Sequence, residues 1–154
     1  MTATETRVER REFLSFRLGN EEYAIDILKV REIRAHEAAT RIPNTPGFMK
    51  GVINLRGTIV PIMDLRVRFG FEDVHDVSTV TIILSIGREV GIVVDAVSDV
   101  VALSAEEIRP APELKSVLDG GFIHGIAPID GRMLIVLDIE RLMAGTGMEL
   151  AEAA

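Results

Sequence analysis

The side chains best suited to acid–base or metal chemistry are histidines and aspartates that lie far apart in the sequence. The three histidines share no short ligand spacing and belong to no helical metal-binding motif; they are His36, His75 and His124. A carboxylate pair for general acid–base catalysis could come from five aspartates, which are Asp26, Asp64, Asp95, Asp99 and Asp138. Aspartates at strand ends more commonly punctuate strands or cap helices. We therefore expect no metal site and no catalytic residue.

Motifs that would prepare a nucleophile or bind a cofactor are missing from the sequence. The chain contains no cysteine, so it has neither a disulfide framework nor thiolate chemistry, which fits a reducing compartment. It has no G-x-S-x-G, no P-loop and no strand-flanked G-x-G-x-x-G. These observations predict a protein that is not an enzyme and that needs no cofactor. A small acid–base enzyme that uses an aspartate pair is the least favoured hypothesis.

Charge is distributed unevenly along the chain. The formal net charge of the 154 residues is −7, which argues against nucleic-acid binding because phosphate contacts need a basic surface. Residues 29–68 nevertheless hold eight basic and three acidic residues, a local charge of +5 against −12 elsewhere. This basic segment is either an ordinary solvated face or a patch that docks an acidic partner.

A duplicated pattern indicates how the chain is organised. Residues 51–65 can be laid without gaps over residues 125–139, because both stretches keep a glycine, an apolar arm, a turn glycine, a longer apolar arm and an aspartate. A weaker echo pairs residues 22–30 with residues 89–97. Self-similarity of this kind indicates two related structural units.

About ten short segments with the alternation of β-strands are separated by turn signals, and few segments have helical periodicity. The two repeat copies are predicted to be hairpins that differ at the turn, where the first has Arg56 and the second has Asp130. Asp64 and Asp138 are predicted to cap a short helical turn after each hairpin, and residues 104–107 carry a capping-box pattern. We predict an all-β protein, with two small barrels or curled sheets favoured over one sandwich.

The chain is expected to divide into four segments. These are a polar N-terminal tail at residues 1–12, a first β-barrel half at 13–70, a second half at 79–143 and a C-terminal tail at 144–154, with strand exchange allowed between the halves. The N-terminal tail lacks the apolar region of a signal peptide. No apolar run approaches the roughly 20 residues of a membrane span. We expect a cytoplasmic protein without direct membrane insertion.

Several stretches together resemble the bacterial chemotaxis coupling proteins of the CheW family. They read EYAIDILKVREIR at residues 22–34, IPNTPGFMKGVINLRG at 42–57, IVPIMDLR at 59–66, GIVVDAVSDV at 91–100 and EIRPAP at 107–112. The occurrence of these strings in this order is highly specific, and the resemblance extends from residue 13 to residue 143.

This resemblance implies both a fold and a function. A member of the family would have two tandem five-stranded SH3-like β-barrels packed on a shared hydrophobic interface, with short helical turns. It would be a non-enzymatic adaptor that couples the cytoplasmic tips of methyl-accepting chemoreceptors to the regulatory domain of the histidine kinase CheA, in membrane-associated arrays. The alternative is a scaffold of the same family in a chemosensory pathway that does not control motility.

The resemblance also implies roles for residues that match the motifs. Ile27, Val30 and Glu32 would lie on the kinase-facing surface. Arg56 would lie at a receptor-binding groove between the barrels, with Val80 as a second receptor contact. Val30 and Glu32 share one strand face by alternation, as expected for an apolar anchor beside a polar rim. We expect the kinase surface and the receptor surface to be separate.

Overall fold

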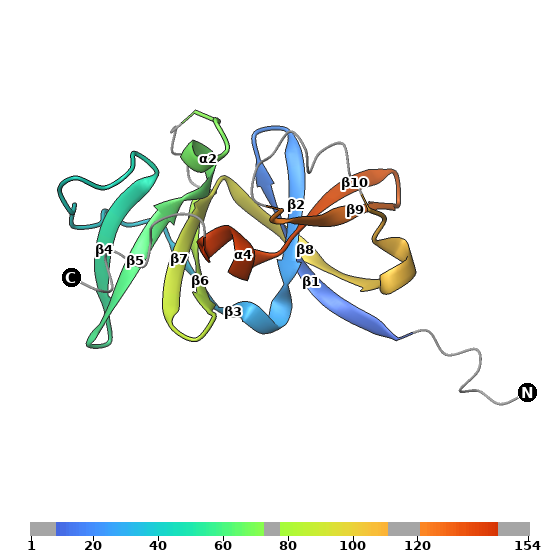
Figure 1. Ribbon diagram of the computed structural model, residues 1–154, viewed down its shortest axis with the longest axis horizontal. Coiled ribbons are helices and arrows are strands. Elements are labelled where there is room, and N and C mark those ends of the chain that lie inside the picture. The colour runs from blue at the N-terminus through green and yellow to red at the C-terminus, as the bar shows by residue number, and fades with distance from the viewer. Residues whose placement is uncertain (1–8, 73–77, 111–120, 145–154) are drawn as a thin grey trace, which may run out of the picture.

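Ten β-strands form two five-stranded sheets in the computed structural model, which describes residues 9–72, 78–110 and 121–144 (Figure 1). The strands are β1 (Arg10–Leu18), β2 (Glu21–Asp26), β3 (Val30–Ala35), β4 (Met49–Leu55), β5 (Thr58–Asp64), β6 (Val80–Ser85), β7 (Glu89–Val94), β8 (Ala96–Ser104), β9 (Ile123–Ile129) and β10 (Arg132–Leu137). The helical turns are η1 (Ile27–Lys29), α2 (Leu65–Arg68), η2 (Ala105–Glu107) and α4 (Ile139–Ala144). The predicted all-β fold of two tandem five-stranded SH3-like barrels with short helical turns is confirmed.

Each barrel draws strands from both halves of the sequence. Barrel A has the strand order β8-β1-β2-β10-β9, and barrel B has the order β3-β6-β7-β5-β4. The two orders correspond strand by strand, because the chain crosses from barrel A to barrel B after β2 and returns after β7. In each barrel a parallel pair joins the two halves, β2 with β10 and β5 with β7. The two repeat copies thus supply equivalent hairpins, β4–β5 and β9–β10, to different barrels.

An isolated backbone bridge closes each barrel. Thr40 exchanges two hydrogen bonds of 2.9 Å with β4, and Arg109 exchanges bonds of 2.9 and 2.8 Å with β9. The carbonyl of each bridging residue lies against the first glycine of the repeat. A Cβ atom at Gly51 would lie 1.9 Å from Thr40 O, and one at Gly125 would lie 2.5 Å from Arg109 O. Closure of the barrels therefore requires a residue without a side chain at both positions.

Side-chain caps begin the helical turns as the sequence predicts. Asp64 Oδ1 accepts a hydrogen bond of 3.0 Å from the backbone N–H two residues further on, and Asp138 Oδ1 accepts one of 3.1 Å from the third N–H. In the capping box, Ser104 N–H donates to Glu107 Oε1 at 2.8 Å. The predicted caps are confirmed. Within the described ranges, no helix has both the length and the apolar character needed to cross a membrane.

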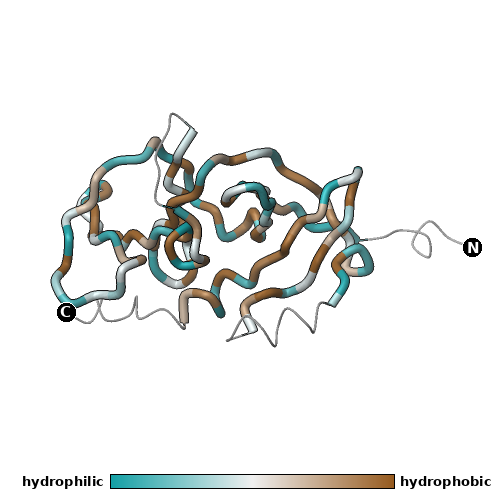
Figure 2. The backbone as a smooth tube through the Cα atoms, turned by 90° about the horizontal axis from the view of Figure 1, so that it is seen from above, coloured by the Kyte–Doolittle hydropathy of each residue, from teal (hydrophilic) through white to brown (hydrophobic). Residues whose placement is uncertain are grey.

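Apolar side chains fill both barrels and the space between them. One cluster lies inside each barrel, around Val136 in barrel A and Val60 in barrel B. The largest cluster combines residues of β1 and β2 with residues of β6, β7 and α4, so it is the predicted shared interface. Figure 2 shows hydrophobic residues (brown) concentrated along the strands and hydrophilic residues (teal) at the outer turns. Edges and turns therefore remain for contacts with other molecules.

Candidate functional site

The residues that the sequence assigns to binding are spread over four elements. Ile27 lies in η1, Val30 and Glu32 lie in β3, Arg56 lies in the β4–β5 turn and Val80 begins β6. All of these elements except η1 belong to barrel B, in which β3 is an edge strand. An edge strand offers backbone and side-chain groups that no neighbouring strand covers. The edge at β3 is therefore a suitable contact surface for another protein.

The η1 turn exposes a leucine that the sequence analysis did not identify. Asp26 caps this turn by accepting a hydrogen bond of 2.9 Å from Leu28 N–H, and the Leu28 side chain is 82% exposed. Ile27 and Val30, by contrast, are half-buried and pack against the cluster between the barrels. These two residues therefore support the core as well as the surface. In the sequence, Leu28 could be noticed only as an apolar residue in the short stretch between Asp26 and the strand that begins at Val30. This stretch follows neither strand alternation nor helical periodicity.

Strand β3 alternates as the sequence indicates, but an apolar side chain lies on its more exposed face. Val30, Glu32 and Arg34 are half-buried, whereas the three residues on the other face are exposed: Arg31, Ile33 and Ala35. Ile33 retains 45% of its surface in contact with solvent. An exposed isoleucine on an edge strand is a better apolar anchor for a partner than the half-buried Val30.

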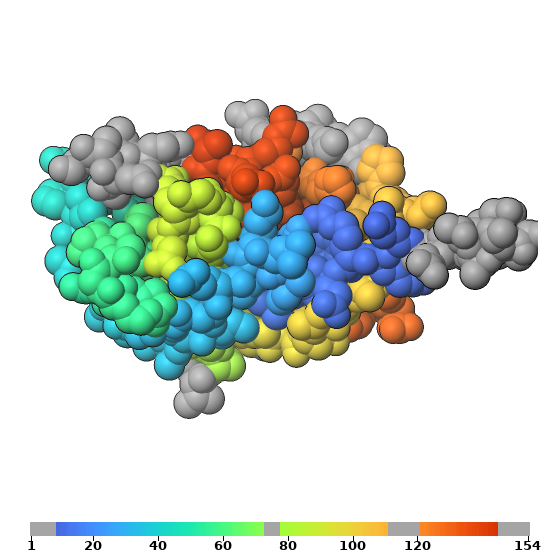
Figure 3. Space-filling view, turned by 90° about the horizontal axis from the view of Figure 1, so that it is seen from below, coloured from blue at the N-terminus to red at the C-terminus, as the bar shows by residue number. Residues whose placement is uncertain are grey.

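A chain of ion pairs runs across this surface. Arg56 Nη2 lies 2.5 Å from Glu32 Oε1 and links the β4–β5 turn to β3. Arg34 lies 3.2 Å from the other oxygen of Glu32 and 3.1 Å from Glu37. The hydrogen bond from Arg56, followed by the one from Arg34, lowers the pKa of Glu32, and hydrogen bonds to Glu37 and Glu32 raise the pKa of Arg34. Figure 3 shows β3, in light blue, beside the green β4–β5 hairpin on one face of the molecule.

The contact between Glu32 and Arg56 joins two residues that were expected on different surfaces. Both residues lie in barrel B, so their ion pair connects two parts of the same barrel. These two residues are therefore neighbours in the fold, and the separation of a kinase surface from a receptor surface stays a prediction. Val80 lies at the other end of β3 from Val30, where it pairs with Ala35 and packs against the cluster between the barrels.

The β4–β5 turn presents Arg56 to solvent. Arg56 and Gly57 have φ angles of +52° and +87°, as in the tight hairpin turns that favour glycine and asparagine, and Asn54 Oδ1 accepts a hydrogen bond of 2.9 Å from Gly57 N–H. The Arg56 side chain is 59% exposed despite its ion pair. A guanidinium group has five N–H donors in a fixed plane, so the pair with Glu32 leaves donors for a second carboxylate.

The basic segment at residues 29–68 does not form a single positive patch. Six of its eight cations form ion pairs. Three of these cations pair with carboxylates from later in the chain, which are Glu89, Asp95 and Glu140. Among the residues that the structure describes, Arg41 and Arg68 are the two cations of the segment without a carboxylate partner. Positive charge without a carboxylate partner is therefore confined to these two positions of the described segment.

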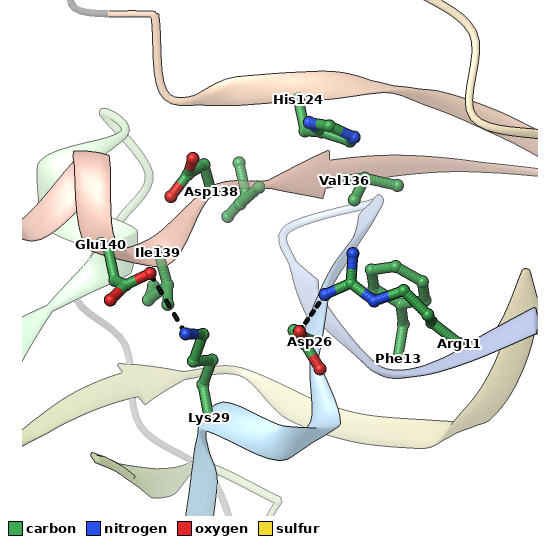
Figure 4. Close-up of a pocket in the computed structure, with 10 residues that line it drawn as sticks. Arg11, Phe13, Asp26, Lys29, His124, Val136, Asp138, Ile139 and Glu140 are labelled. Carbon is green, nitrogen blue, oxygen red and sulfur yellow. Dashed lines mark hydrogen bonds and ion pairs between the residues drawn. The ribbon is translucent and has the colours of Figure 1, made fainter. Parts of the chain in front are cut away.

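A polar cleft of about 210 Å³ opens beside η1 (Figure 4). Lys29 of η1 forms an ion pair of 3.1 Å with Glu140 of α4, and Arg11 of β1 forms one with Asp26. His124 of β9 lines the cleft from the side opposite η1. The Lys29–Glu140 pair ties the crossover between the barrels to the helical turn that follows β10.

The five aspartates considered for catalysis all accept hydrogen bonds within the fold. Their donors are Leu28 N–H for Asp26, the Arg66 side chain for Asp64, Gly19 N–H for Asp95, Ser15 Oγ for Asp99 and Arg141 N–H for Asp138. These bonds hold turns and strands in place. In the described part of the chain, no three histidine, aspartate or glutamate side chains gather as a metal site would require. His75 lies outside the described residues.

Known proteins match both the sequence and the fold. Residues 12–146 match the family model described as a CheW-like domain. The chain is 57% identical over 143 residues to the chemotaxis protein CheW of Klebsiella aerogenes, with 92% of this chain and 86% of that protein covered. It is 42% identical to a probable chemotaxis protein CheW of Rhizobium etli, with 92% of each covered. The scaffolding protein TtCheW of Thermoanaerobacter tengcongensis superposes with a TM-score of 0.77 at 36% identity, with 84% of this chain and 89% of that chain covered. Because these matches extend over most of its length and agree with its paired barrels, the chain belongs to the CheW family of chemotaxis proteins.

Proposed function

We propose that this protein is a non-enzymatic adaptor that couples the cytoplasmic tips of chemoreceptors to the regulatory domain of the histidine kinase CheA. Its family and the scaffolding role named for TtCheW support a chemotaxis scaffold. The finer proposal rests mainly on the Glu32–Arg56 ion pair. This contact connects a residue that we assign to the kinase surface with one that we assign to the receptor surface. The adaptor would act in the cytoplasm, recruited to membrane-associated receptor arrays.

We assign the kinase surface to η1 and β3. Exposed Leu28 and Ile33 would supply its apolar centre, with contributions from half-buried Ile27 and Val30. Glu32 would belong to the polar rim. The charged side chains of this edge strand oppose pairing with arbitrary strands, so a partner must offer complementary charge as well as an apolar pocket.

We assign the receptor surface to Arg56, with Val80 as a second contact. The exposed guanidinium of Arg56 has donors beyond those that Glu32 uses. Glutamate side chains of a receptor tip would suit these donors, because arginine holds carboxylates in a fixed planar geometry.

Contact between Glu32 and Arg56 makes the two surfaces dependent on each other. A receptor carboxylate that binds the remaining donors of Arg56 would share the guanidinium with Glu32. Replacement of Arg56 by glutamate would place two like charges together, so it would disturb Glu32 as well as receptor binding. We therefore expect Arg56→Glu to weaken kinase binding to a smaller but measurable extent.

Calorimetric titration of the full chain with the isolated CheA regulatory domain tests the proposal. Wild type should bind saturably, and Leu28→Asp should weaken binding by on the order of 1–3 kcal/mol because it places a charge in the apolar centre. Met133→Asp is the matched control, since Met133 is an apolar residue of barrel A that is 58% exposed. Val30→Asp is a poorer test because Val30 also packs on the core.

Two results would contradict the proposal. No saturable binding by wild type would remove the adaptor function. Equal affinities for wild type and Leu28→Asp would remove η1 from the kinase surface. A parallel titration with receptor-tip fragments should show that Arg56→Glu loses most receptor binding.

A further inference from the structure

A second opening lies on the side of the molecule that carries α2. Figure 1 shows α2 at the upper edge, whereas η1 and the β4–β5 turn lie at the lower edge. A cavity of about 300 Å³ opens there between the two barrels. Barrel A contributes Tyr23, Ile123 and Ile135, and the end of α2 with the residues that follow it contributes Phe69 and Phe71. None of the residues assigned above to kinase or receptor binding lines this cavity.

The walls of the cavity are packed aromatic rings. The rings of Tyr23 and Phe69 are tilted with centroids 5.5 Å apart, and those of Phe69 and Phe122 are stacked at 5.6 Å. Tyr23 also stacks on buried Phe16 at 6.0 Å, so the wall is continuous with the core between the barrels. Apolar pockets of this size lie at the lower end of the range for specific ligand sites and are usually preformed. The cavity has room for one large apolar side chain.

Arg68 is half-buried in the lining of this cavity, and its guanidinium lies over two aromatic rings. Its Cζ atom lies 5.6 Å from the ring centroid of Phe48 and 5.5 Å from that of Phe122, within the range of cation–π attraction. Arg68 has no carboxylate partner among the described residues, and nearby Glu21 accepts a hydrogen bond of 3.1 Å from the Tyr23 hydroxyl. The stacked guanidinium therefore keeps its N–H donors for another acceptor.

Comparison of the repeat copies shows that Arg68 is specific to the first copy. Phe48 and Phe122 occupy equivalent positions, since their carbonyls accept hydrogen bonds of 2.7 and 2.8 Å from Asp64 N–H and Asp138 N–H. Arg68 bridges the two equivalent rings, whereas its counterpart Leu142 is buried in the core. The fold therefore tolerates an apolar residue at this repeat position, so the repeated backbone does not require the cation.

We propose that this cavity binds a segment of a partner protein in which a large apolar residue lies next to a glutamate or aspartate. The apolar side chain enters between Tyr23, Phe69 and Phe71, and Arg68 binds the neighbouring carboxylate. A protein segment is favoured over a free small acid because the related TtCheW is a scaffolding protein, and because the cavity takes one side chain while a cation in its lining is left for a neighbouring carboxylate. This interaction goes beyond the coupling function proposed above.

Nuclear magnetic resonance titration of the full chain tests the proposal with two capped peptides, Ac-Ala-Phe-Glu-Ala-amide and Ac-Ala-Phe-Gln-Ala-amide. We expect saturable shifts at the amides of Phe69, Phe71 and Phe122, with the glutamate peptide binding about fivefold tighter, the upper range for an exposed ion pair. Arg68→Gln should abolish this preference. Arg17→Gln, which removes an exposed charge from β1, should retain it.

Three outcomes would overturn the proposal. No shift at the cavity with either peptide would remove the site. Equal binding of both peptides by wild type would remove the role of Arg68. Tighter binding of free 3-phenylpropionate than of the glutamate peptide would identify a site for small carboxylates instead of a protein segment. Titration of Arg68→Gln with the CheA regulatory domain separates the two proposals, because its affinity should equal that of wild type.

Discussion

The two copies of the hairpin share one backbone conformation but place different residues in it. Asp130 has φ +50° and Gly131 has φ +76°, and Arg56 and Gly57 have nearly the same angles. Aspartate is among the residues that tolerate this left-handed region, whereas arginine gains no local hydrogen bond there. The second copy therefore has a residue suited to the turn. The first has one suited to a contact beyond it, and in this structure that contact is Glu32.

The helical turns after the hairpins differ in a complementary way. Asp64 and Asp138 both act as caps. The second residue after the cap is Arg66 in the first copy and Glu140 in the second. Arg66 is fully buried and donates to Asp64 at 2.9 and 2.7 Å, and it also lies 3.4 Å from Asp95. Glu140 is largely exposed and pairs with Lys29. The first copy thus places an ion pair inside the fold, and the second places one at a cleft.

Removing the buried cation should produce the largest effect. Arg66→Met leaves the buried carboxylate of Asp64 without its main partner, so we expect a loss of about 3–5 kcal/mol in the free energy of unfolding, measured in urea. Glu140→Met, the equivalent change in the second copy, should cost less than about 1 kcal/mol because its pair is exposed.

A double variant shows whether the uncompensated charge is the cause. Adding Asp64→Asn to Arg66→Met removes the buried negative charge and keeps a side chain that can cap α2, so it should recover part of the stability. Equal losses for Arg66→Met and Glu140→Met would contradict a difference between the two copies in the burial of their ion pairs.

Replacement of the repeated glycines should cause the next largest losses of stability, and the loss should be larger at Gly51 than at Gly125. Gly51→Ala places a Cβ atom 1.9 Å from a backbone oxygen at a φ of +135°, so we expect a loss of roughly 3 kcal/mol or more. Gly125→Ala meets a backbone oxygen at 2.5 Å without a positive φ, and about 2 kcal/mol is expected. Thermal unfolding of both variants measures the difference. A larger loss at Gly125 would contradict the closer approach at Gly51.

Local features of this fold could be predicted from the sequence because the interactions that determine them span only a few residues. The turn at Arg56 and the caps at Asp64 and Asp138 each depend on neighbouring backbone atoms. Alternation likewise identified β3. The topology of two barrels came from the resemblance to a family, since strand alternation alone does not determine which strands pair.

The contacts of the candidate site could not be predicted, because they depend on strands that are distant in sequence. Glu32 and Arg56 meet only because β3 and the β4–β5 hairpin belong to the same barrel, to which the chain crosses after β2. Exposure of Leu28 and Ile33 also depends on packing rather than on residue type. Arg66 was counted as part of a basic segment, although its carboxylate partners bury it completely.

A salt-bridge network in barrel A should make stability depend on pH. Its centre is Arg132, whose counterpart in the first copy is Thr58. Arg132 donates two hydrogen bonds to Glu22 at 2.8 and 2.7 Å and two to Asp99 at 3.0 and 3.3 Å. The hydrogen bonds from Arg132 lower the pKa of both carboxyls in the folded state. The unfolded chain therefore takes up protons at a higher pH, so this stabilisation is present above the ordinary values of 4.5 and 3.8 and is lost as pH falls through the lowered ones.

Arg132→Gln should therefore lower stability by about 1 kcal/mol at neutral pH, the size expected for a bidentate pair at a partly exposed site. The difference from wild type should shrink as pH falls below 4.5, the ordinary value for Glu22. Urea unfolding at a series of pH values measures it, with Thr58→Gln as the control from the first copy. A constant difference down to pH values below the lowered pKa of both carboxyls would exclude the linkage.

The smallest effect on stability is expected at the two equivalent turns, which hold Arg56 and Asp130. Arg56→Ala and Arg56→Asn both remove the ion pair with Glu32, but asparagine tolerates a positive φ and alanine does not, so the asparagine variant should be more stable by about 0.5 kcal/mol. Asp130→Asn should likewise be more stable than Asp130→Ala by a similar amount, because the two turns have nearly equal φ angles. Receptor binding separates the copies, since both Arg56 variants should lose it and neither Asp130 variant should. Retained binding by Arg56→Asn would mean that the arginine is tolerated at this turn without serving the contact proposed for it.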